Sequence, residues 1–152
     1  MVDVDAGLFT VGVFQDAAWA QKALDALAQA RFAAESLTFI AKDAPANAAL
    51  LEKTFGQAGQ RFELFAVGAV VAHGPMLAVL QGSSRDLTKL GLSGTMRRVG
   101  FQPHDCRIFE ALTGRGGVFV SVRGEARVSD ALELFLSYGG GNAAIGAWGG
   151  RV

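Results

Sequence analysis

The chain has 152 residues, of which 51% are hydrophobic and 18% are charged. This composition excludes a disordered chain, and the length allows one domain to bury a core without disulfides or structural metals. The 14 basic and 14 acidic residues cancel. The chain therefore lacks the strong positive field of nucleic-acid-binding proteins, and we expect no nucleic-acid partner.

Cysteine content and the terminal segment bear on the compartment. The single cysteine, Cys106, excludes a disulfide within the chain. The first residues carry Asp3 and Asp5, where a signal peptide carries positive charge. We therefore expect a cytoplasmic protein.

The apolar stretch from Leu64 to Leu80 contains Gly74 and Pro75 and falls short of the ~20 residues of a spanning helix, so we expect no membrane span.

The first elements in chain order are a strand, a helix and a second strand. Val11–Phe14 is a short apolar run typical of a strand, and Asp16 is a suitable helix N-cap. The segment 17–32 is rich in helix formers. Its apolar positions recur on one face of a helix. They are Ala20, Ala23, Leu24 and Leu27. Leu37–Ile40 then predicts the second strand.

The middle of the chain predicts short helices around an extended segment. Helical patterns cover 46–56, 76–80 and, in part, 84–99, where Gly91 and Gly94 are expected interruptions. Residues 62–72 are typical of extended chain. Residues 102–105 have the character of a turn and a helix start, and the segment 106–116 predicts a further helix that ends near the glycines of Gly114–Gly117.

The closing elements repeat the opening ones. Val118–Val122 reads VFVSV and predicts a strand, and Val128–Tyr138 predicts a helix that ends at Gly139–Gly141. The remaining residues, 142–152, predict either a glycine-weakened edge strand or a tail. Segment 11–27 aligns without a gap to segment 119–135, and the match lies in apolar positions rather than in the turns. Such a match is typical of duplicated strand–helix units.

The duplication predicts an α+β fold, a ferredoxin-like sandwich of two β-α-β units. We expect one domain over 1–152, with the first unit at 11–41 and the second at 117–148. A glycine-rich, partly helical insert over 42–116 separates them. In each unit a right-handed crossover is expected to return the chain to a neighbouring parallel strand.

Catalytic and metal-binding chemistry finds little support in the motifs. His104, Asp105 and Cys106 are adjacent, yet adjacent residues rarely point at one ion, so we predict a helix start rather than a metal site. Cys106 lacks a nucleophile signature and is expected to be a buried small hydrophobe. The glycine clusters at 114–117 and 139–141 follow helices, whereas phosphate loops precede them. We therefore expect no cofactor and assign no catalytic residue.

Two other groups of residues are candidates for binding. His73, Arg97, Arg98 and His104 could contact a small anion in a pocket between the sheet and residues 66–100. Trp19 and Trp148 could anchor a contact between subunits, because aromatic residues favour interface centres.

The opening VGVFQDAAWAQKALDALAQARF with SLTFIAKD resembles the bacterial general stress protein, or heat-induced stress protein, domains. GAVVAHGPMLAVLQG and MRRVGFQPHDCRIFEALTGRGGVFVSVRG are similar to the glycine-rich centre and closing half of that group. The resemblance covers most of residues 10–138 and implies a stress-associated cytoplasmic role in a largely uncharacterised family.

The sequence favours a non-catalytic, stress-associated or regulatory domain that acts through self-association or partner binding. Because sheet edges need covering, we expect a homodimer or a larger assembly. Two alternatives stay open: a sensor of a small anionic ligand, and an enzyme of unknown reaction using His104 or Cys106.

Overall fold

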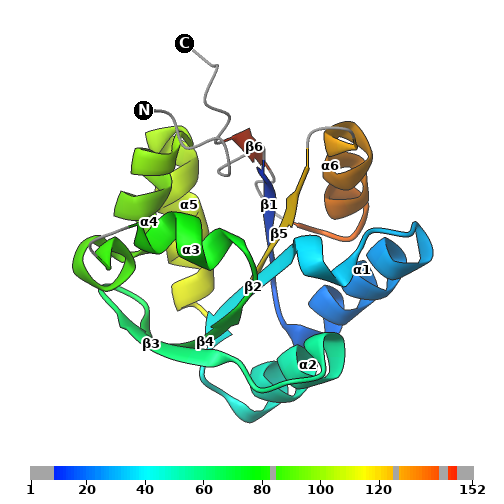
Figure 1. Ribbon diagram of the computed structural model, residues 1–152, viewed down its shortest axis with the longest axis horizontal. Helices are drawn as coiled ribbons and strands as arrows, with labels where there is room; N and C mark the ends of the chain where they lie inside the picture. The colour runs from blue at the N-terminus through cyan, green and yellow to red at the C-terminus, as the bar shows by residue number, and fades with distance from the viewer. Residues whose placement is uncertain (1–8, 83–84, 125–126, 141–143, 147–152) are drawn as a thin grey trace.

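The computed structural model describes residues 9–82, 85–124, 127–140 and 144–146. It shows an α+β fold built on one six-stranded antiparallel sheet (Figure 1). The strands are β1 (Phe9–Phe14), β2 (Leu37–Lys42), β3 (Gln60–Leu64), β4 (Gly68–His73), β5 (Val118–Arg123) and β6 (Ala144–Gly146). The helices are α1 (Ala17–Gln29), α2 (Pro45–Phe55), α3 (Met76–Gln81), α4 (Asp86–Val99), α5 (Pro103–Gly114) and α6 (Val128–Ser137), with a 3₁₀ turn η1 (Ala34–Ser36).

The strand order is β3-β4-β2-β5-β1-β6. Both β1 and β2 pair antiparallel with β5, so β1 and β2 are parallel to each other but are not neighbours. The expectation of neighbouring parallel strands was therefore wrong, because β5 lies between them. The side chains of β5 from Val118 to Val122 are all buried, which suits a strand at the centre of a sheet covered on both faces.

Helices cover both faces of this sheet (Figure 1). The face covered by α1, α2 and α6, here called the α1 face, buries Phe14, Phe39 and Val120 against Leu24 and Phe135, among others. The opposite face, here called the α5 face, is covered by α3, α4 and α5. Its core includes Val11, Ile40, Phe119, Met96 and Phe109. The insert between the two strand–helix units thus supplies the second helical layer.

The two similar segments occupy equivalent positions in this architecture. Val11 and its aligned residue Phe119 are both buried on the α5 face. Leu27 and its aligned residue Phe135 are both buried on the α1 face. Strands β1 and β5 are themselves neighbours, with Val11 opposite Ser121. The apolar pattern shared by the two segments therefore corresponds to shared burial.

Two local signals set the first helix as expected. The Asp16 carboxylate accepts a hydrogen bond from the Trp19 backbone N–H at 3.0 Å and caps α1. The buried residues of α1 are the four that the periodicity predicts. No helix in the described part of the chain is both long enough and apolar enough to cross a membrane.

Two expectations need correction, and one pair of alternatives is decided in part. Residues 62–72 form a hairpin rather than one extended segment, because the Val67 N–H donates to the Leu64 carbonyl at 3.2 Å and Ala66 takes a left-handed conformation. Helix α4 breaks only at Gly91 (φ 77°, ψ 178°), and Gly94 stays helical. Within 142–152, the structure describes β6, which pairs with β1 as an edge strand; the other residues lie outside the described ranges.

Candidate functional site

The proposed anion-binding residues lie on opposite sides of the sheet. The His73 ring packs against Phe55 of α2, with ring centroids 4.5 Å apart, on the α1 face. Arg97 and Arg98 belong to α4, which covers the α5 face. The space between the sheet and this helix is filled by apolar side chains, among them Leu92 and Met96. The structure therefore does not bring His73 and the two arginines together.

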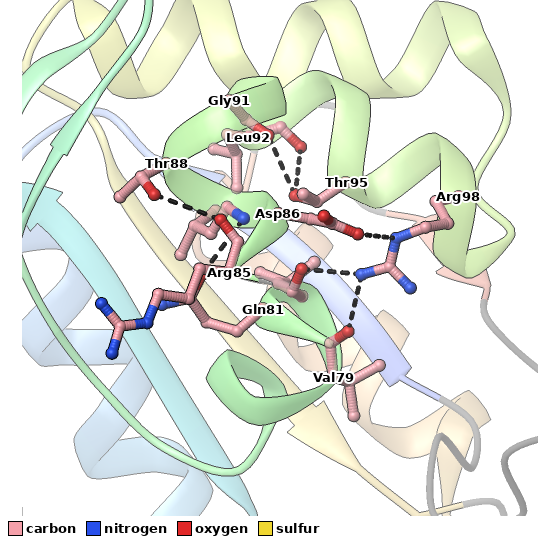
Figure 2. A network of polar contacts seen from close by, with 11 residues as sticks. Val79, Gln81, Arg85, Asp86, Thr88, Gly91, Leu92, Thr95 and Arg98 are labelled. Atoms are coloured by element: carbon pink, nitrogen blue, oxygen red, sulfur yellow. Dashed lines mark hydrogen bonds and ion pairs between the residues drawn. The ribbon is translucent and has the colours of Figure 1, made fainter. Parts of the chain in front are cut away.

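Arg98 is engaged in holding two helices together (Figure 2). Its Nη2 donates to the carbonyls of Val79 at 3.0 Å and Leu80 at 2.7 Å, near the end of α3. Its Nε forms an ion pair at 3.2 Å with Asp86, at the start of α4. These contacts satisfy two of the last carbonyls of α3, which lack partners within that helix. Arg97 beside it is exposed.

The break in α4 is bridged by a carboxylate from α5. The Glu110 Oε2 accepts from the backbone N–H of Ser93 at 3.1 Å, two residues after Gly91. The Thr95 hydroxyl donates to the carbonyls of Gly91 and Leu92 in the same turn (Figure 2). The polar groups of this helical layer therefore serve backbone groups left open by short helices and by the break.

The His104–Asp105–Cys106 segment begins α5, as expected. His104 is exposed, and Cys106 is fully buried in the core of the α5 face. Burial raises the pKa of the Cys106 thiol to about 11, and the neighbouring Asp105 carboxylate adds to this increase. The thiol is therefore protonated at neutral pH and closed to reagents, which disfavours a nucleophilic role. Among the described residues, no three metal-ligating side chains gather at one point.

An open pocket of about 290 Å³ lies where β1 ends. Val13, Phe14 and Leu112 form apolar walls, and Gln15 and Arg115 add polar groups. Gly117 is required here, because a Cβ at this position would come within 2.7 Å of the Leu112 carbonyl oxygen and of Val13 Cγ1. Arg115 directly follows the C-terminal residue of α5. A positive charge at the C-terminal end of a helix interacts favourably with the helix dipole.

The predicted subunit anchors are placed only in part. Trp19 lies in the first turn of α1 with 38% of its surface exposed, and the Lys22 ammonium lies 4.5 Å from its ring centroid. Trp148 lies outside the described residues.

The position of β3 at the edge of the sheet was not predicted from the sequence. This strand pairs with β4 on one side, and no strand in the described ranges pairs with its other side. Arg61 and Glu63 are exposed, and Phe62 between them packs partly into the core of the α5 face. Phe65, one residue beyond β3, is 76% exposed. Alternation of charged residues around one aromatic residue is the signal that indicates such an edge.

Comparisons with protein-family models, with curated proteins and with solved structures found no match.

Proposed function

We propose that this protein is a non-catalytic α/β domain that acts through self-association. The observation that carries the proposal is the free edge of β3, together with exposed apolar side chains beside it. An uncovered edge presents unpaired backbone donors and acceptors, which another strand can satisfy. The buried, protonated Cys106 favours this role over nucleophilic catalysis, and the separation of His73 from the two arginines favours it over a sensor that binds an anion with these residues.

The finer fold assignment is also a proposal. The order β2-β5-β1-β6, with β1 and β2 parallel and β5 between them, supports a ferredoxin-like core of two β-α-β units. In this view α3, α4 and α5 are an addition that covers the second face of the sheet. A stress-associated, cytoplasmic role in bacteria is supported only by the sequence resemblance to stress protein domains.

The molar mass in solution tests the proposed function. We expect size-exclusion chromatography with light scattering, from about 5 to 200 µM, to give a mass that rises from the 15.9 kDa monomer toward twice that value. A mass that stays at the monomer over the whole series would contradict self-association.

A further inference from the structure

The free edge of β3 has a charge pattern that is complementary to itself. Its five residues read Gln60, Arg61, Phe62, Glu63 and Leu64. Reversing the direction of this strand about Phe62 exchanges the positions of Arg61 and Glu63. We propose that two copies of the chain pair antiparallel through β3 about a two-fold axis at Phe62. This inference rests on the proposed function and specifies its partner, a second copy of this chain.

The faces of β3 restrict where the axis can pass. Phe62 and Leu64 contribute to the core of the α5 face. Side chains alternate along a strand, so Arg61 and Glu63 lie on the α1 face. In an antiparallel pair, two residues that lie directly opposite each other project their side chains to the same face of the sheet. A two-fold axis perpendicular to the sheet relates the two strands without exchanging the two faces. Near the centre of β3, the axis must therefore pass through residue 61, 62 or 63.

Charge then selects one register among these three. An axis at residue 61 places two Arg61 side chains opposite each other, and an axis at 63 does the same with two Glu63 side chains. Like charges directly opposite each other destabilise a strand pair. The axis at Phe62 instead places each Arg61 opposite Glu63 of the partner subunit and stacks the two Phe62 residues side by side. The two-fold symmetry gives two Arg–Glu pairs in each interface.

The edge is accessible for this pairing. The Arg61 side chain is 69% exposed even though its Nε forms an ion pair with Asp43 at 2.9 Å. A guanidinium carries five N–H donors, so one carboxylate does not exhaust it. Glu63 makes no ion pair with a described residue. Association would bring a second carboxylate to Arg61 and a cation to Glu63.

Exposed apolar side chains flank the same end of β3. Phe65 is 76% exposed, and Leu90 on α4 is 50% exposed. The two positions are close, because a Cβ at Gly91 would lie 3.6 Å from the Phe65 Cβ. Burial of part of this surface would add an apolar contribution to the edge pairing, which hydrogen bonds and ion pairs alone support weakly.

Charge reversal on one strand or the other tests the register. We expect Arg61→Glu and Glu63→Arg each to weaken self-association by about tenfold or more, because both place like charges opposite each other. A 1:1 mixture of the two variants should regain dimers, since every opposite pair across the mixed interface is then Arg with Glu. Arg61→Glu also removes the ion pair between Arg61 and Asp43 and could destabilise the fold for that reason. Glu63→Arg keeps this ion pair, so weaker association of the Glu63→Arg variant cannot result from its loss.

Sedimentation velocity gives the readout, with circular dichroism to show that each variant is folded. Matched controls are Glu133→Arg on α6 and Arg107→Glu on α5, which make the same charge changes at exposed positions elsewhere. Both controls should associate like the wild type. If wild type dimerises and the β3 variants dimerise equally well, the register is wrong while the proposed function stands. If wild type is monomeric at 200 µM, both are wrong.

Discussion

Thr10 on β1 and Thr38 on β2 are both fully buried in the sheet. The Thr38 hydroxyl accepts a hydrogen bond from the backbone N–H of Met76 at 2.9 Å and fixes the start of α3. The Thr10 hydroxyl has no hydrogen-bond partner in the described part of the chain. A buried polar group without a partner costs free energy, whereas a satisfied one stabilises the fold modestly.

The same substitution at these two positions should therefore have different effects. Thr38→Val leaves a buried Met76 N–H without an acceptor, and we expect the free energy of unfolding to fall by about 1–3 kcal/mol. Thr10→Val removes an unsatisfied hydroxyl, so its effect should be neutral or stabilising. Urea denaturation of both variants measures the difference. Equal losses at the two positions would contradict the assigned roles.

At the scale of elements, the short helices α3 and α4 depend on contacts to each other. Helices of this length are unstable alone, because nucleation fixes many backbone angles for few hydrogen bonds. Arg98 joins the last carbonyls of α3 to Asp86 of α4. The adjacent Arg97 is exposed and makes no ion pair with a described residue.

Neutralising each arginine in turn measures this connection. We expect Arg98→Gln to lower the free energy of unfolding by about 1–2 kcal/mol, a value moderated by the partial exposure of the side chain. Arg97→Gln is the matched control and should change it by less than about 0.5 kcal/mol. Thermal melts followed by circular dichroism report both. Equal effects would show that Arg98 does not join the helices.

Local elements of this fold could be predicted from the sequence, because their causes are local. The cap at Asp16, the buried face of α1 and the strand at β5 follow from residue type and spacing. The placement of β5 between β1 and β2 could not, because pairing partners far apart in the chain leave no local signal. For the same reason, the sequence could not predict which of the two adjacent arginines binds the carbonyls of α3. In the structure Arg98 binds them and Arg97 is exposed.

At the scale of the whole molecule, the two similar units and the insert between them contribute different strands and helices to the fold. The units supply β1, β2, β5 and β6 and the helices α1 and α6, while the insert supplies α3, α4 and α5 on the opposite face and adds α2 to the α1 face (Figure 1). The insert also extends the sheet by β4 and β3, and this extension creates the free edge. A symmetric dimer through β3 would bury that edge in one continuous sheet.

Disulfide cross-linking measures the β3 pairing most directly. Opposite residues of antiparallel strands have Cα atoms about 4.5–5.5 Å apart, within disulfide range. We predict rapid disulfide-linked dimers for Phe62→Cys and slow ones for Gln60→Cys, because the two copies of residue 60 would lie about 13 Å apart along the strands. Wild type is the blank, since Cys106 is buried and protonated. Equal rates for the two variants, or no cross-link at residue 62 in a protein that dimerises, would contradict the account.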